Sequence, residues 1–272
     1  MNATDFQTRL HQDDPLFGTL IVSPAPEWLK AVKLLPLDYV FFDTEHIALD
    51  RAPLSWMCRA YAEAGLPAVV RIPSPDPYQA CMVLDGGAAA VLAPYVETEE
   101  EVAALVGAVK RRPLKGEKLR RLLGGEAQPE TLRQYMDRHN QSNSLLINIE
   151  SVPALERLDR LLAVPGLDGV IVGPHDLSCS LGVPEQWSAP VFQEAVASII
   201  RQTRARGLAV GVHVIYEGGL EHERRWLELG ANLILHQADI LAFRFAMARD
   251  LQALRQAQAE GSAAGAKQEL MI

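Results

Sequence analysis

Residues 144–178 read SLLINIESVPALERLDRLLAVPGLDGVIVGPHDLS, and this stretch contains one complete strand–helix–strand pattern. Its apolar runs at Ser144–Ser151 and Gly169–Ser178 are almost continuously hydrophobic, as in parallel strands that are covered on both faces. Between them, residues 152–164 have helical periodicity and start after Ser151 with Val152-Pro153, a typical helix beginning. The stretch therefore predicts two parallel strands joined by a helix.

The same unit recurs along the chain, which predicts eight strands in all. The apolar runs are Phe17–Ser23, Tyr39–His46, Pro67–Pro73, Ala88–Val96, Ser144–Ser151, Gly169–Ser178, Ala209–Val214 and Asn232–Gln237. A doubly wound sheet is the alternative, but the first turn, VSPAPEWL (22–29), has no GxGxxG phosphate-binding loop. We therefore expect an α/β protein with the (β/α)₈ architecture of a TIM barrel, which needs about 250 residues.

The domain organisation follows from this count. Residues 1–256 are expected to form a single barrel domain with one oversized connection, the insertion 113–143 after the fourth unit. That insertion is either a lid or interface element or a surface excursion without a catalytic role. The small and polar residues 257–272 predict a disordered tail.

Composition excludes several classes of protein. The chain has 272 residues, 49% hydrophobic, and a net charge of −8, which argues against nucleic acid as a partner. No apolar run approaches the roughly 20 residues of a membrane span, so we expect no membrane partner, and the N-terminus lacks the pattern of a signal peptide. Cys58, Cys81 and Cys179 form no CxxC pair, which argues against a disulfide framework or zinc cluster and favours a cytoplasmic location.

Two carboxylates end neighbouring strands of the predicted barrel, at the face where TIM barrels carry their chemistry. Glu150 ends the fifth run and Asp176 follows the sixth, so both can reach one cation. Two hard oxygen ligands with open positions suit Mg²⁺ or Mn²⁺, and nearby imidazoles also allow Co²⁺. The alternative is that each carboxylate only caps the following helix.

Asp43, His46 and Arg71 end the second and third runs, across the barrel from these carboxylates. His46 can transfer protons near neutral pH, Asp43 can orient its imidazole, and Arg71 can bind a carboxylate or a developing oxyanion. The alternative is a buried ionic network of these residues with Glu45. His213 and His236 also end strands, so they are either residues of the site or, as the sequence favours, core histidines with satisfied hydrogen bonds. No lysine ends a strand, which argues against a Schiff-base mechanism.

The motifs DTEH (43–46), VVRIP (69–73), NIES (148–151) and GPHDLS (173–178) together resemble the HpcH/HpaI family of class II, metal-dependent 2-oxo acid aldolases. The resemblance covers roughly residues 15–255 and implies that Glu150 and Asp176 bind the metal. It also implies that His46, held by Asp43, assists proton transfer and that Arg71 stabilises a pyruvate enolate. Departures from the family pattern are Asn148 in place of glutamine, GPHD in place of GPAD, and no clear Arg-Gly loop after the fourth helix.

The resemblance implies an aldolase that cleaves or forms a 2-oxo-4-hydroxy acid from a 2-oxo acid and an aldehyde, with Arg71, Pro174 and His175 contacting the substrate. It further implies a hexamer, a trimer of dimers that exchange the C-terminal helix, here residues 239–256. Two other functions stay open. One is a metal-dependent citrate-synthase-like or acyl-CoA lyase that uses the basic stretch 115–121, and the other is a non-catalytic barrel that binds a 2-oxo acid.

Overall fold

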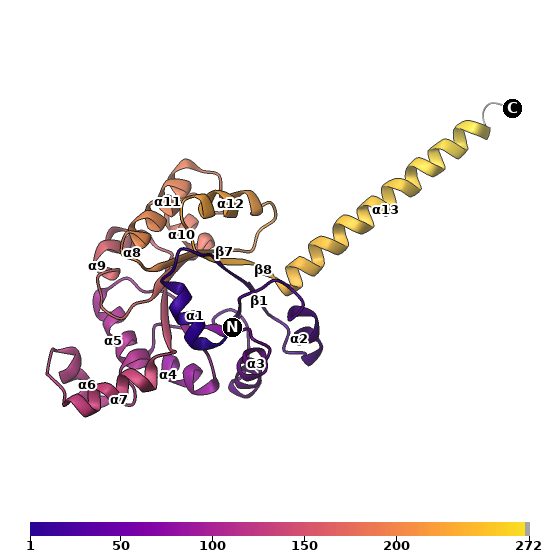
Figure 1. The fold of residues 1–272 in the computed structure, drawn as a ribbon. Coiled ribbons are helices and arrows are strands. Elements are labelled where there is room, and N and C mark those ends of the chain that lie inside the picture. Colours follow the sequence, from indigo (N-terminus) through magenta and orange to yellow (C-terminus); the bar gives the residue numbers. More distant parts are fainter. Residues whose placement is uncertain (270–272) are drawn as a thin grey trace.

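A computed structural model describes the backbone of residues 1–269 and the side chains of residues 1–259. Eight parallel strands form one closed barrel in sequence order, which confirms the predicted TIM barrel (Figure 1). The strands are β1 (Leu16–Leu20), β2 (Tyr39–Asp43), β3 (Ala68–Arg71), β4 (Ala90–Ala93), β5 (Ser144–Ile149), β6 (Gly169–Val172), β7 (Ala209–Val214) and β8 (Leu233–Ala238).

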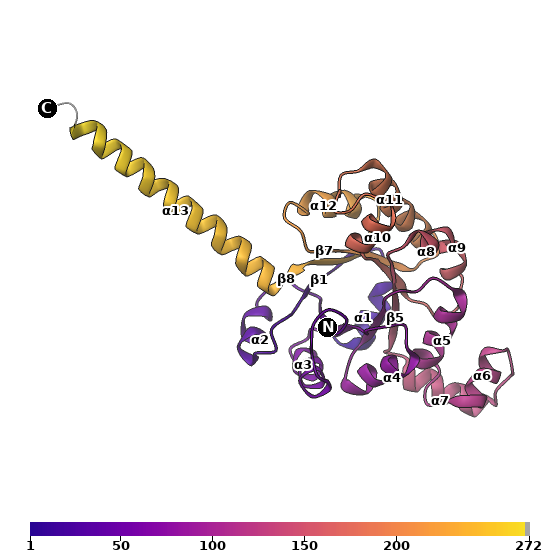
Figure 2. The same ribbon diagram turned by 180° about the vertical axis from the view of Figure 1, so that it is seen from behind.

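Most of the helices surround this barrel on its outer side, whereas α1 packs against the core inside the barrel and α13 projects away (Figures 1 and 2). The helices are α1 (Ala3–Leu10), α2 (Pro26–Val32), α3 (Arg51–Glu63), α4 (Pro77–Gly86), α5 (Glu99–Lys110), α6 (Gly116–Leu123), α7 (Glu130–Asn140), α8 (Val152–Glu156), α9 (Leu158–Leu161), α10 (Pro174–Ser180), α11 (Pro190–Arg204), α12 (Leu220–Glu228) and α13 (Asp239–Glu269). Ser151 caps α8 as expected, because its side chain accepts a hydrogen bond from the Ala154 N–H. None of the helices in the described part of the chain has the length and hydropathy to cross a bilayer.

The inside of the barrel is a packed core that becomes polar at one end. Tyr39 fills its lower part, where the phenol donates to the Ile234 carbonyl at 2.9 Å. Gly18 makes room for this ring, since a Cβ there would lie 2.4 Å from it. Toward the carboxyl ends of the strands, which we call the mouth, the inward positions change from Phe41 to Asp43 and from Val69 to Arg71. Because side chains alternate along a strand, this change places polar groups on top of an apolar floor.

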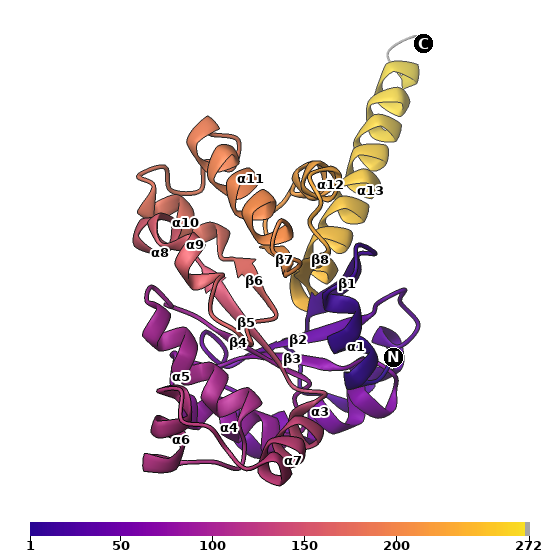
Figure 3. The same cartoon turned by 60° about the vertical axis from the view of Figure 1, so that its left-hand side comes forward.

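The insertion forms α6 and α7, which lie beside α4 and α5 (Figure 3). It leads from the end of α5 into the start of β5, and Asn140 on α7 donates a hydrogen bond to the Arg112 carbonyl. At the same end, Lys110 pairs with Asp168, the residue just before β6. The insertion therefore lies at the amino ends of the strands, opposite the mouth. The expectation of a lid over the mouth of its own barrel is wrong.

Helix α13 projects away from the barrel (Figures 1 and 2). A row of its apolar side chains is 43–67% exposed: Ile240, Phe243, Met247, Leu251 and Leu254. The space between α12 and the loop before β2 holds an apolar cavity of about 430 Å³. Its apolar lining includes Phe17, Pro36, Leu37, Leu220, Leu227 and Ile234. The segment expected to be disordered from 257 onward is helical as far as Glu269, and residues 270–272 lie outside the described residues.

Candidate active site

The mouth of the barrel contains a cavity of about 470 Å³. Phe41, Leu92 and Ile171 form its apolar floor, and each belongs to the core inside the barrel. The cavity also brings together most of the residues that the sequence indicated. These are Asp43, His46, Arg71, Pro174, His175 and Asp176.

Arg71 is fixed by two acidic residues at the mouth. Its Nε lies 2.9 Å from Asp43 Oδ1 and its Nη2 lies 2.5 Å from Oδ2. Its Nη1 is 3.0 Å from Glu45 Oε2. All three side chains are at least nine-tenths buried. Burial alone raises the pKa of Asp43, but the hydrogen bonds and charge of Arg71 outweigh this effect, and the net pKa is lowered. The three residues thus form the ionic network that was the alternative interpretation of these positions.

His46 has a different partner from the one expected. Asp43 accepts hydrogen bonds from Arg71 and from the Glu45 N–H, whereas His46 Nε2 lies 3.5 Å from Glu45 Oε1. The prediction that Asp43 orients His46 is therefore wrong, because the imidazole lies beside Glu45 instead. The imidazole is 59% exposed at the rim of the mouth cavity, so a bound substrate can reach it.

Glu150 is a buried carboxylate with one described hydrogen bond, from the Tyr95 N–H to Oε1 at 2.7 Å. Tyr95 has a φ of 55°, a left-handed conformation that is unusual for a residue with a Cβ. Burial raises the pKa of Glu150 to about 7, and the negative charges of Asp176 and Glu45 act in the same direction. A nearby cation would reverse both effects.

Asp176 stands in the first turn of α10 and is 48% exposed at the mouth. Its charge acts on Glu150, which places the two carboxylates in one electrostatic environment. Within the described residues no group of three or more His, Cys, Asp or Glu side chains could enclose a metal ion. Glu150 and Asp176 are two carboxylates at the mouth that could bind a hard divalent cation such as Mg²⁺.

Gly173 leaves the room that the Glu150 carboxylate occupies. A Cβ at this position would lie 2.6 Å from Glu150 Oε2 and 3.0 Å from Glu150 Cβ. The next two residues, Pro174 and His175, line the mouth cavity at the start of α10. His175 Nδ1 lies 3.7 Å from Asp176 Oδ1, and its Nε2 lies 3.7 Å from Glu185 Oε1.

His213 is a mouth residue for which the sequence favoured the role of a core histidine. It lines the mouth cavity with its ring edge toward Phe41, at a centroid distance of 5.4 Å. Its Nε2 is buried and has no hydrogen-bond partner, so the expected satisfied core histidine is wrong. Asn148 Oδ1 is buried without a partner in the same cavity. Alternate residues of a strand face the same side. His213 therefore shares a face with the buried Gly211, and this pattern could have placed His213 inside the mouth.

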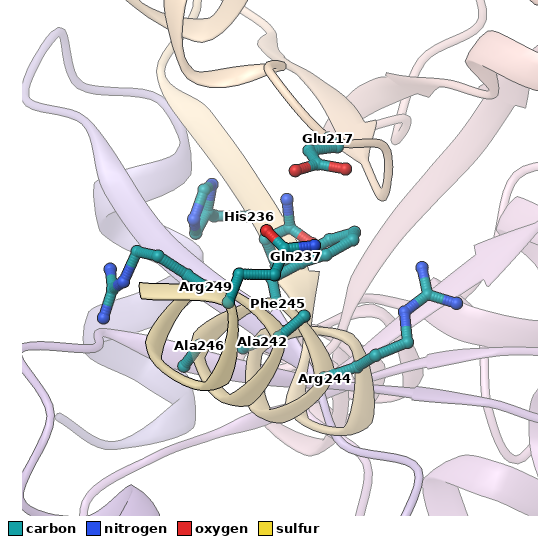
Figure 4. Close-up of a pocket in the computed structure, with 10 residues that line it drawn as sticks. Glu217, His236, Gln237, Ala242, Arg244, Phe245, Ala246 and Arg249 are labelled. Carbon is teal, nitrogen blue, oxygen red and sulfur yellow. The ribbon is translucent and has the colours of Figure 1, made fainter. Parts of the chain in front are cut away.

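His236 is also not a core histidine. It is half-exposed on β8, and its Nδ1 lies 2.7 Å from Glu223 Oε2 on α12. A larger cavity of about 750 Å³ lies beside it, between α13 and the loop after β7 (Figure 4). The charged side chains of this cavity, Glu217, Arg244 and Arg249, are exposed. The buried carboxylates and Arg71 are at the mouth, which makes the smaller cavity the candidate active site.

Comparison with known proteins places this barrel in a family. The sequence profile of the HpcH/HpaI aldolase/citrate lyase family matches residues 17–235, which include every motif at the mouth. The chain belongs to this family. As a member of the HpcH/HpaI family it is a carbon–carbon lyase, which agrees with its aldolase relatives.

Two curated relatives are each 29% identical over 258 residues, 95% of this chain. One is a hydroxypyruvate/pyruvate aldolase from Agrobacterium fabrum, of which the alignment covers 94%. The other is a 2-keto-3-deoxy-L-rhamnonate aldolase from Salmonella gallinarum, of which it covers 96%. A solved HpcH/HpaI family structure from Burkholderia cenocepacia J2315 superposes with a TM-score of 0.79 at 27% identity, covering 93% of this chain and 99% of that one.

Proposed function

We propose that this protein is a divalent-metal-dependent class II aldolase that forms or cleaves a 2-oxo-4-hydroxy acid through a pyruvate-type enolate. The observation that carries the proposal is the mouth itself. Asp176, Arg71 and the accessible imidazole of His46 line one cavity, and the buried carboxylate of Glu150 interacts electrostatically with both Asp176 and Arg71. The aldolase relatives support the same reaction class.

Glu150 and Asp176 would hold the metal, with Mg²⁺, Mn²⁺ and Co²⁺ as the candidates. A bound divalent ion would act as a Lewis acid that lowers the energy of the enolate formed from a 2-oxo acid. The raised pKa of Glu150 supports this assignment, because an unpaired buried carboxylate gains most from a cation.

Arg71 would bind and orient the 2-oxo acid. A guanidinium has five N–H donors, and the hydrogen bonds to Asp43 use two of them, while Nη1 forms an ion pair with Glu45. N–H groups that are not bonded to Asp43 can donate to the 2-oxo oxygen, where negative charge develops. Asp43 and Glu45 are then positioning residues, because they hold the guanidinium in one orientation.

His46 would move the proton at C3 of the 2-oxo acid. When its imidazole accepts this proton, the C3–H electron pair forms the enolate and charge moves to the 2-oxo oxygen. The enolate carbon then bonds to the aldehyde carbon, and the aldehyde oxygen accepts a proton; cleavage reverses each step. The floor of Phe41, Leu92 and Ile171 keeps bulk water away from the enolate.

Exchange of pyruvate methyl protons for deuterium tests the proposal directly. We expect exchange with Mg²⁺, Mn²⁺ or Co²⁺, and a loss of at least 100-fold in Glu150→Gln and Asp176→Asn. Mn²⁺ binding measured by electron paramagnetic resonance gives a second readout and should weaken in both variants. Asp159→Asn, an exposed carboxylate on α9, is the matched control.

The absence of exchange with all three metals would contradict the aldolase proposal. Turnover that requires acetyl-CoA would instead support a citrate-synthase-like or acyl-CoA lyase. Metal-dependent pyruvate binding without exchange or turnover would support a non-catalytic barrel.

We further propose that the protein is a homo-oligomer, with the hexamer that the family resemblance implies, in which α13 of one copy packs on the next. Helix α13 has an exposed apolar row, and the cavity beside α12 is also apolar. No residue of α13 lines that cavity in its own chain, so α13 of another copy could pack there. Light scattering should give a mass several times 29.9 kDa, and Phe243→Asp should lower it. A monomeric wild type would refute this arrangement.

Three free cysteines support a cytoplasmic location.

A further inference from the structure

His213 carries a polar atom at the mouth that the proposed reaction does not use. Its Nε2 is buried, and no described atom donates to it or accepts from it. Leaving such a group without a partner destabilises the fold, so an orphaned atom that lines a substrate cavity is a candidate ligand contact.

The protonation state of this ring follows from its surroundings. Burial lowers the pKa of His213 to about 3, and the positive charge of Arg71 acts in the same direction. The imidazole is therefore neutral at physiological pH. The Gln237 backbone raises the pKa of His213, as a carbonyl acceptor close to a ring N–H does, and Nε2 is the ring nitrogen that is buried without a partner. We assign the proton to Nδ1, which leaves a lone pair on Nε2 as a hydrogen-bond acceptor.

His213 lies across the barrel from Arg71. It belongs to β7, four strands from β3, which Arg71 ends, and next to β6, which Asp176 follows. The Phe41 ring approaches both residues, with its centroid 5.4 Å from that of the His213 ring and 5.9 Å from Arg71 Cζ. The remaining wall near His213 is apolar and includes Leu20, Ile47 and Ile215. A single acceptor in an apolar wall selects a ligand with a hydroxyl donor.

We propose that His213 Nε2 accepts a hydrogen bond from a hydroxyl group of the aldehyde substrate, so that the enzyme selects hydroxylated aldehydes. This inference rests on the proposed aldolase function, because it needs the 2-oxo acid to occupy the side of Arg71. His213 is thereby a specificity-determining residue, and proton transfer stays with His46.

Two aldehydes of matched size test the proposal. Glycolaldehyde and propionaldehyde differ by a hydroxyl in place of a methyl group, and each is added to pyruvate by wild type, His213→Leu and His213→Gln. We expect wild type to favour glycolaldehyde in kcat/KM by about 10- to 100-fold relative to His213→Leu. His213→Gln, which keeps an acceptor, should retain part of the preference. Because every variant receives the same aldehyde solutions, differences in aldehyde hydration cancel.

Val214→Ala is the matched control, since Val214 is the next residue on β7 and packs in the core outside the barrel. It should keep the wild-type preference. Equal preference in wild type and His213→Leu would overturn the inference, and so would a wild type that does not favour glycolaldehyde. Pyruvate exchange in wild type distinguishes a failure of the proposed aldolase function from a failure of the inference about His213. Its absence overturns the aldolase function together with this inference, and its presence without aldehyde preference overturns this inference alone.

Discussion

Asp43 and Arg71 are direct neighbours in the register of β2 and β3, and two hydrogen bonds of 2.9 and 2.5 Å join their side chains. The guanidinium fork and the carboxylate meet at two points, which fixes both the position and the plane of Arg71. Glu45 holds the remaining terminal nitrogen at 3.0 Å. The mouth therefore presents a positive group whose orientation is set before any substrate binds.

Replacing Asp43 with asparagine should impair stability and activity together. The amide keeps the shape but leaves the Arg71 charge without its main partner, and breaking a buried pair of this kind costs about 3–5 kcal/mol. Urea denaturation should report this loss, and pyruvate exchange should slow by about 10²-fold because Arg71 is less well oriented. Wild-type values in both measurements would contradict the positioning role. Arg71→Lys, which keeps the charge without the fork, should show the same slow exchange.

Gly173→Ala should weaken metal binding without unfolding the barrel. The added methyl group would lie 2.6 Å from Glu150 Oε2, and the flexible end of that side chain can move away. Displacing a metal ligand in this way should lower Mn²⁺ affinity by about 10- to 100-fold. Electron paramagnetic resonance measures the affinity and circular dichroism measures the fold. Gly86→Ala tests glycine replacement elsewhere, because a Cβ at that position would meet only Ser55, at 3.8 to 4.0 Å. Unchanged affinity in Gly173→Ala would argue against Glu150 as a ligand.

His213 should make the protein less stable in acid. Its pKa is lowered from 6.5 to about 3 in the folded state, so below pH 6.5 the unfolded chain binds a proton that the folded chain does not. Stability is therefore lost as the pH falls from about 6.5 toward 3, by up to about 1.4 kcal/mol per pH unit. Urea denaturation of wild type and His213→Gln between pH 7.5 and 4.5 measures the difference. Parallel curves for the two proteins would show that His213 is not buried in its neutral form.

Asp168 should matter for stability alone. At the amino ends of the strands it accepts from the Leu145 N–H at 2.7 Å and pairs with Lys110 and His11. Burial alone would raise the pKa of Asp168, but these partners outweigh it and lower the net pKa. Asp168→Asn should lower the free energy of unfolding by about 3–5 kcal/mol and leave pyruvate exchange by the folded enzyme unchanged. A selective loss of exchange would contradict the separation of the two faces.

His11, at the same face as Asp168, should make stability depend on pH in the opposite direction to His213. Its hydrogen bond to Asp168 raises the pKa of His11 above 6.5, so its contribution to stability is complete below pH 6.5 and is lost as the pH rises through the folded pKa. His11→Gln should remove this decline. Thermal unfolding of the two proteins between pH 6 and 8.5 measures it, and identical pH dependences would refute the pairing.

The strands could be predicted from sequence because their apolar runs are nearly continuous and glycine or proline separates them from the helices. The polar residues at the strand ends were equally visible, since Glu150 and Arg71 follow runs in which no charge aids packing. Their partners were not visible. Asp43 pairs with Arg71 rather than His46 because the β2–β3 register sets the two side by side, and a single sequence does not contain that register.

The errors have separate physical causes. His213 resembles a core residue in sequence, and only the three-dimensional cavity shows that Nε2 lacks a partner. The direction of α13 depends on packing that its composition does not specify. The position of the insertion was predictable, because a connection from a helix to the next strand of a TIM barrel lies at the amino ends of the strands.

The arm formed by α6 and α7 offers an attachment point for engineering. Its tip, Gly124-Gly125, is exposed and lies on the face opposite the mouth. A reporter domain inserted between these glycines, or a tag used to fix the enzyme on a solid support, would leave the mouth open to the solution. We expect the chain to tolerate additions at this exposed site, because it lies far from the residues of the mouth.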